Sequence, residues 1–141
     1  LWALGVLAEI VLFWFMPRLT LRYRQKWLYL FAMGVAVVRY QMIAWGTAWL
    51  GVLIVAQLMH AFTFGVHHSL SIAYVHRLFG EAHQTQGQAL YIVFTYGLGG
   101  TLASLLAGFF WNVLGGSGLF ALASAASLIA LIMCWRGLQE S

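Results

Sequence analysis

Five long apolar runs, separated by short polar breaks, constrain this chain more than any other feature of its sequence. A helix needs about 20 consecutive apolar residues, with a range of roughly 17–25, to cross a bilayer. Hydrophobic residues make up 63% of the 141 residues and charged residues only 7%, whereas soluble domains carry about 25% charged residues. A soluble fold of this length could not cover so much apolar surface, so we predict an all-α membrane protein.

The runs predict five transmembrane helices, at about 1–16, 27–44, 48–75, 89–111 and 119–135. Pro17 should end the first helix, and turns should lie at 45–47 and at the Gly-rich segment 112–118. The third apolar run begins at Ala48 and continues to Phe79. At about 1.5 Å per residue, a helix over this run would be about 48 Å long. Its far end should therefore bend or project into water. Residues 80–88 should form a polar loop and residues 136–141 a polar tail.

The basic residues predict which side each loop faces. On the five-helix map, six of the seven Lys and Arg residues fall on one side, and positively charged loops stay in the cytoplasm. These six are Arg18, Arg22, Arg24, Lys26, Arg77 and Arg136. We therefore expect a multi-pass protein of the cell inner (plasma) membrane with a cytoplasmic C-terminus. No basic stripe of the kind that binds nucleic acid is present in the sequence, so the net charge of +4 does not indicate such a partner.

Two further features bound the chain. The single cysteine, Cys134, excludes an internal disulfide and a cysteine-based zinc site. The sequence starts without Met and without a basic segment before its first apolar run. A cleavable signal peptide is not expected from this pattern, and we expect the chain to be a fragment of a longer protein.

Two charged residues are predicted to lie inside the membrane. Glu9 should lie about 12 Å from the cytoplasmic end of its helix and Arg39 about 20 Å from that side. Ionisable groups inside a bilayer are costly and commonly mark ion or substrate paths. Glu9 could instead make a structural hydrogen bond. Arg39 could pair with Glu9, attract an anionic solute, or extend to the outer headgroups.

The third run carries a polar face. At helical spacing one side holds Gln57, His60, Thr63, Phe64, His67, Ser71 and Tyr74, with His68 at its edge. Such a face must contact protein or water rather than lipid. Tyr91 lies on a shorter polar stripe of the fourth run. Histidine suits proton coupling because its ordinary pKa is about 6.5. It also binds metals, but one His-bearing helix is a weak signal for a metal enzyme, and we predict no metal and no cofactor.

The segment from Gln57 to His68 resembles a signature of the phenylpropionate permease group of the major facilitator superfamily, with matches at His60, Thr63, Phe64 and His68. Residues 5–9, which end in Glu9, resemble the eighth helix of that group, and 88–91 with the following glycines resembles the eleventh. The likeness implies helices eight to twelve, a partial C-terminal six-helix bundle. A more distant similarity is to proton-coupled oligosaccharide symporters, which place Glu, Arg and His where Glu9, Arg39 and His60 stand. Those symporters also carry an acidic residue one turn after the His, and this chain has Thr63 at that position.

These observations together predict a proton-coupled symporter of a small organic solute, and the resemblance implies an aromatic acid such as a phenylpropionate-like compound. Glu9 and His60 are the proton-coupling candidates, and Arg39 is the candidate for charge pairing or anion binding. The candidate cavity residues are Gln57, Thr63, Phe64, His67, His68 and Tyr91. Expected partners are the lipid bilayer, the solute, protons and a missing N-terminal half of the same transporter. The alternatives are a nucleoside or sugar symporter, a His-cluster membrane metalloenzyme and a non-transporting membrane subunit.

Overall fold

The computed structural model describes residues 1–137, and this part of the chain is helical almost throughout. Two helices come first, α1 (Trp2–Arg22) and α2 (Gln25–Gly46). A third rod follows, in which α3 (Leu50–His60) and α4 (His67–Phe79) are joined by the π-helix η1 (Ala61–Val66). After a turn at Gly80 and a short 3₁₀-helix (Glu81–His83), α5 (Gln84–Ile92) leads through the π-helix η3 (Val93–Gly99) into α6 (Gly100–Gly137).

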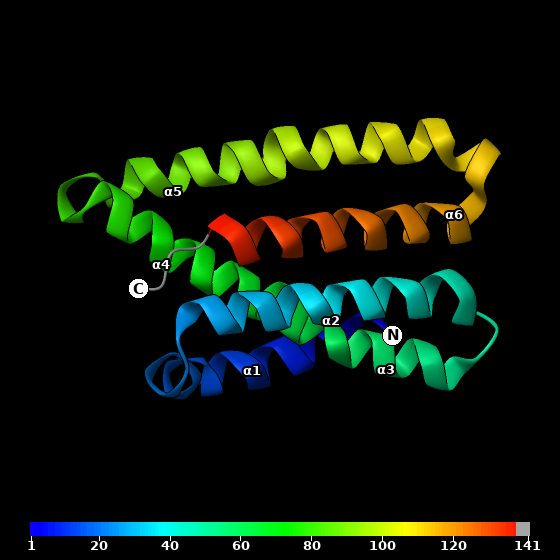
Figure 1. The fold of residues 1–141 in the computed structure, drawn as a ribbon, viewed down its shortest axis with the longest axis horizontal. Helices are drawn as coiled ribbons and strands as arrows, with labels where there is room; N and C mark the ends of the chain where they lie inside the picture. Colours follow the sequence, from blue (N-terminus) through cyan, green and yellow to red (C-terminus); the bar gives the residue numbers. More distant parts are fainter. Residues whose placement is uncertain (138–141) are drawn as a thin grey trace.

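Four of these helical rods are long and apolar enough to cross a membrane: 2–22, 25–46, 50–79 and 81–137. The last has 57 residues and would measure about 86 Å if it were straight. It is not straight, because Gly115 adopts φ 62° and ψ −178°, a conformation that is costly for residues with a Cβ. Figure 1 shows the two legs of this rod running antiparallel on either side of the bend. The expected number of five crossings depends on counting these legs separately and stays a prediction.

Two expected boundaries are wrong. Pro17 lies inside α1, which continues to Arg22. Proline lacks an N–H group, but hydroxyl side chains and neighbouring groups let membrane helices tolerate it. The carbonyl left without its usual donor is that of Phe13, four residues earlier. Beyond the proline, the Thr20 hydroxyl lies within hydrogen-bond distance of the carbonyl oxygens of Met16 at 3.1 Å and Pro17 at 3.0 Å. The polar loop expected at 80–88 is also shorter, because α5 already begins at Gln84 and glutamine is a good helix former.

The third rod contains the π-helix η1 in its middle, and the bend or projection expected at the far end of the third run stays a prediction. Gly46 belongs to α2, so the turn expected at 45–47 begins only at Thr47. Of the tail expected at 136–141, residues 138–141 lie outside the described part of the chain.

A small core forms where α1, α2 and the third rod cross. Its buried members are Leu12, Met16, Leu28, Ala32, Ala61, Val66 and Leu70. The second leg of α6 packs on α2, where the buried Ser124 hydroxyl donates to the Val37 carbonyl oxygen at 3.0 Å. Trp27 and Trp135 meet edge to face, with ring centroids 6.0 Å apart.

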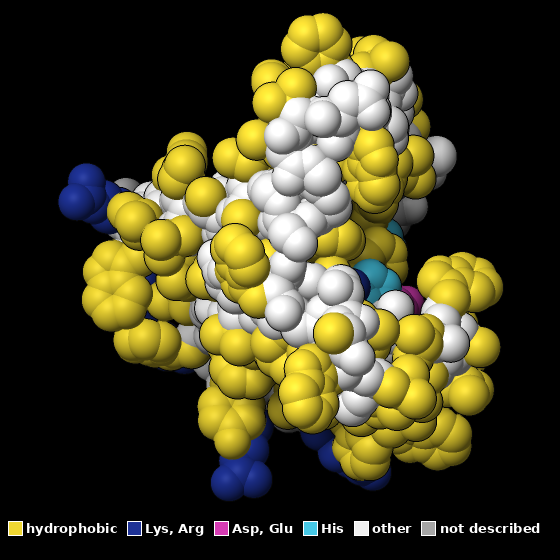
Figure 2. Space-filling view, turned by 90° about the vertical axis from the view of Figure 1, so that its right-hand side faces the viewer, with side chains coloured by type: hydrophobic (Ala, Val, Ile, Leu, Met, Phe, Trp, Pro, Cys, Tyr) yellow, Lys and Arg dark blue, Asp and Glu magenta, His cyan; other side chains and the backbone are white. Residues whose placement is uncertain are grey.

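Large apolar side chains cover most of the outer surface. Trp14 and Phe109 are about three-quarters exposed, and Figure 2 shows apolar side chains over most of the face it presents. Hydrocarbon can cover such a surface where water cannot. The α1–α2 junction, the α4–α5 junction and the end of α6 lie toward the same end of the molecule (Figure 1). These are the segments that carry the six basic residues assigned to one side.

Candidate functional site

An acidic residue of α1 contacts a histidine of α3. Glu9 Oε1 lies 2.9 Å from His60 Nε2, with the Glu9 side chain 14% exposed and the His60 side chain 30% exposed. Gly5, one turn before Glu9, makes this close approach possible. A Cβ at Gly5 would lie 3.2 Å from Gln57 Oε1 and 3.5 Å from His60 Cδ2. Gln57 therefore borders the Glu9–His60 pair on the α1 side, close to where the helical pattern placed it.

Arg39 is held inside the bundle. Its Nε donates to the Ala56 carbonyl oxygen at 2.9 Å, and the residue is only 9% exposed. Arg39 therefore has a hydrogen-bond partner inside the bundle, and its depth relative to the headgroups stays a prediction. The carboxylate of Glu9 contacts His60, while the carbonyl of Ala56 anchors Arg39 through Nε. The Arg39 guanidinium also lies over the Tyr40 ring, with Cζ 5.3 Å from the ring centroid. A guanidinium can bind a carboxylate through two of its nitrogens at once.

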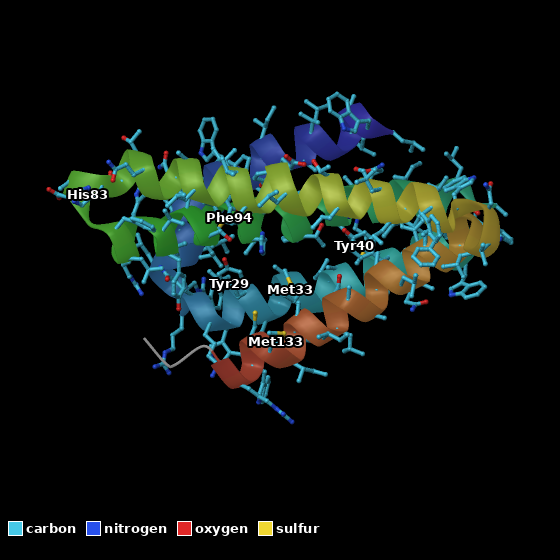
Figure 3. All side chains as sticks on the ribbon, turned by 90° about the horizontal axis from the view of Figure 1, so that it is seen from above. Tyr29, Met33, Tyr40, His83, Phe94 and Met133 are labelled. Carbon is cyan, nitrogen blue, oxygen red and sulfur yellow. The ribbon has the colours of Figure 1, made fainter. Side chains whose placement is uncertain are left out.

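A cavity of about 180 Å³ lies between α2, the third rod and the second leg of α6. Its wall is formed by Met33, Ala36, Arg39, Tyr40, His60, Thr63, Phe64, His67 and Ser127. Figure 3 shows Met33 and Tyr40 along α2, two of these wall residues. Leu58 and Phe62 line a separate apolar hollow with α1 residues. The structure thus brings Arg39 together with the polar face of the third rod.

An aromatic column extends from His60 toward α5. The Phe64 ring stacks on His60 at 5.7 Å and 22° and on His68 at 5.4 Å and 6°. His68 Nδ1 lies 3.0 Å from the Tyr96 hydroxyl, and its ring is 6.2 Å from that of Tyr91. His68, which the α-helical pattern placed at the edge of the polar face, therefore contacts Phe64, Tyr91 and Tyr96 but is not among the cavity-wall residues.

A second hydrogen-bonded group lies beside His67. The Tyr29 ring packs edge-on against His67 at 5.5 Å, and the Tyr29 hydroxyl is 2.5 Å from Ser71 Oγ. Tyr74 also contacts Tyr29. This group joins α2 to α4.

The sequence reasoning missed Tyr29, Tyr40, Tyr96 and Ser127. Tyr29 and Tyr40 lie on α2, where Arg39 is the one strongly polar signal within the apolar run. Tyr96 does not fall on the α-helical stripe that carries Tyr91. The π-helix η3 changes which side chains share a face with Tyr91, and a single sequence does not predict where a π-helix forms.

Residues 1–137 contain no group of three His, Cys, Asp or Glu residues that could hold a metal ion. The metalloenzyme alternative therefore finds no candidate centre in this part of the chain.

Comparisons with known proteins give independent evidence about the family of this chain. The model of the MFS_1 like family matches residues 1–122. A protein of Escherichia coli (strain K12) named probable 3-phenylpropionic acid transporter is 31% identical over 133 residues, which cover 94% of this chain and 34% of that protein. The chain thus spans about a third of the length of this curated relative. No solved structure gives a significant match.

Proposed function

Because the chain belongs to the MFS_1 like family, part of the major facilitator superfamily, we propose that it is part of a secondary transporter that takes up a small aromatic acid together with a proton. Transporters of this superfamily alternate access by moving two helical halves about a site near the bilayer midplane. The proposed transporting unit therefore includes further helices, since this chain spans about a third of its relative. The observation that carries the proposal is the Glu9–His60 pair beside Arg39.

Charge balance gives a reason for coupling. With Glu9 ionised, Arg39 cationic and His60 neutral, the three groups carry no net charge. An anionic solute bound at Arg39 adds one negative charge to a partly buried site, and burying unbalanced charge is costly. One proton taken up with the anion restores neutrality. The site therefore favours one proton for each monovalent anion.

His60 offers a place for that proton. If Nε2 carries the hydrogen that faces Glu9, Nδ1 is the basic nitrogen of the ring. His60 Nδ1 is buried and has no hydrogen-bond partner. Protonation there would place a positive charge on a residue of the cavity wall, where it would attract the carboxylate of a solute. Proton and solute would then stabilise each other's binding.

The aromatic part of the proposal rests on Phe64 and on the relative's name. The name of the relative specifies a phenylpropionic acid, and the Phe64 ring forms part of the cavity wall together with Thr63. Offset or edge-on contacts between aromatic rings are favourable beyond their buried area. A neutral sugar or nucleoside would leave the guanidinium of Arg39 without an anion.

The test is uptake by the full-length transporter in proteoliposomes. With an inward proton gradient the parent should accumulate 3-phenylpropionate above equilibrium. Glu9→Gln keeps the shape of the side chain but removes the charge, so it should abolish accumulation while exchange of solute across the membrane persists. The matched control is Glu81→Gln, because Glu81 lies exposed in the 81–83 turn. This variant should accumulate solute as the parent does. Full accumulation by Glu9→Gln would make Glu9 a structural residue.

A further inference from the structure

An apolar furrow runs over the surface where α1, α2 and the third rod lie side by side (Figure 1). Two adjacent hollows form it, of about 410 Å³ and about 490 Å³, and both are lined by Leu19 and Phe62. Tyr23, Trp27 and Phe31, which also belong to its wall, are about half exposed. No residue of this furrow lines the polar cavity. The furrow is therefore a separate feature that the proposed solute site does not use.

The furrow is long enough for one acyl chain. Its wall includes Ala8 and Tyr23, both of α1, and helix geometry puts about 22 Å between these positions. One leaflet provides about 15 Å of hydrocarbon, half of the bilayer core. A chain in the furrow could therefore extend from the end of α1 to the middle of the bilayer.

Positive charge lies at one end of the furrow. Residues 18–26 carry four of the seven Lys and Arg residues, and residues 10–80 contain no acidic residue. Arg18 Cζ lies 5.7 Å from the ring centroid of Phe15, and Arg22 Cζ lies 5.7 Å from that of Tyr23. Both rings belong to the furrow wall, and both arginines are exposed. Two guanidiniums therefore lie directly against the furrow, where an anionic group could bind them.

The occupant must combine an apolar part with an anionic end. The halves of a transporter in this superfamily meet at the solute site, and the furrow has no wall residue in common with the polar cavity. The furrow therefore faces the bilayer rather than the other half of the transporter. Anionic lipids of the bilayer bind basic segments next to the end of a membrane helix, and they have the required combination of chemistry.

We propose that the furrow binds one anionic phospholipid, with an acyl chain along Leu19 and Phe62 and the phosphate at Arg18 and Arg22. Arginine suits this role because its guanidinium binds phosphate oxygens through two nitrogens at once. A lipid bound only by the folded protein would also stabilise it. The proposal does not depend on which solute the transporter carries.

The experiment titrates lipid into the purified full-length transporter in a neutral detergent and follows thermal unfolding. Phosphatidylglycerol is the probe, and phosphatidylcholine with the same acyl chains is the reference. We expect phosphatidylglycerol to stabilise the parent at lower concentration than phosphatidylcholine. Arg18→Gln and Arg22→Gln should each weaken phosphatidylglycerol binding about fivefold, which corresponds to about 1 kcal/mol for each basic residue near an anionic headgroup.

Two further variants separate charge at the furrow from charge in general. Arg22→Lys keeps the charge and should retain most of the phosphatidylglycerol preference. The matched control is Arg77→Gln, because Arg77 is an exposed arginine in the last turn of α4 and does not line the furrow. This variant should bind phosphatidylglycerol as the parent does. A phosphatidylglycerol with a photoreactive diazirine on its acyl chain should label residues 8–31 or 58–66.

Equal stabilisation of the parent by the two lipids would overturn the proposal. An equal loss in Arg22→Gln and Arg77→Gln would also overturn it, because general surface charge would then explain the preference. Labelling confined to residues outside the furrow would mean that another helix of the transporter or a second copy covers it. Loss of aromatic-acid uptake with the lipid preference intact would overturn only the proposed function.

Discussion

Gly87→Ala should destabilise the protein, because α4 leaves no room for a side chain at this position of α5. A Cβ at Gly87 would lie 2.6 Å from Phe79 Cδ2, 2.7 Å from Phe79 Cγ and 2.9 Å from Val75 Cγ1. These atoms belong to a ring and a branched side chain, which cannot yield by rotating a flexible tip. Overpacking of this kind costs about 1–3 kcal/mol. Moving the 37% exposed Phe79 ring into the surroundings would instead lose about 1–2 kcal/mol of burial.

Replacing glycine by alanine also stabilises a helix by about 1 kcal/mol through helix propensity. The control is therefore another Gly→Ala change in a helix, so that this gain cancels in the comparison. Gly34→Ala, inside α2, provides it because nothing lies within 4 Å of a Cβ there. The difference in unfolding free energy between the two variants should therefore be about 1–3 kcal/mol. Thermal unfolding of purified full-length protein in detergent measures it. Equal stability of Gly87→Ala and Gly34→Ala would refute the close packing of α4 on α5.

Two other predictions concern topology and helix packing. A reporter fused at the C-terminus should be active on the cytoplasmic side and one inserted at 112–118 on the outer side, because six of the seven basic residues fall on one side of the map; the reverse pattern would invert the map. Tyr29→Phe and Ser71→Ala should each lower the unfolding free energy by about 0.5–1.5 kcal/mol. The two hydroxyls share one contact of 2.5 Å, so the double variant should lose little more than either single variant. Fully additive losses on thermal unfolding would mean that the contact contributes nothing.

The sequence was informative where one physical rule decides the outcome. Apolar length located the helical rods, because backbone groups in hydrocarbon must be satisfied within a helix. Helical spacing likewise grouped His60, Thr63 and His67, which now line one cavity. Arg39 joined them because a buried guanidinium must find an acceptor, although the sequence could not identify that acceptor as the Ala56 carbonyl.

The rest depended on departures from regular helix geometry. A π-helix forms i→i+5 hydrogen bonds, so it turns less per residue than an α-helix. Across η1 this brings His68 into line with His60 and Phe64, where a regular wheel sets it apart. Across η3 it brings Tyr96 to His68. Pro17 shows the opposite error, since a residue that ends helices in water is accommodated within α1.

The contact between Ser124 and Val37 has a consequence for the order of assembly. These residues are 87 positions apart in the chain, and ribosomes add about 5–20 residues per second. The α2 surface that will receive the second leg of α6 therefore waits roughly 4–17 s after its own synthesis before its partner exists. During that interval lipid, the insertion machinery or a neighbouring helix must cover it. The last helix thus acts as the closing element of the bundle, and truncations before Ser124 should accumulate as species with an uncovered α2.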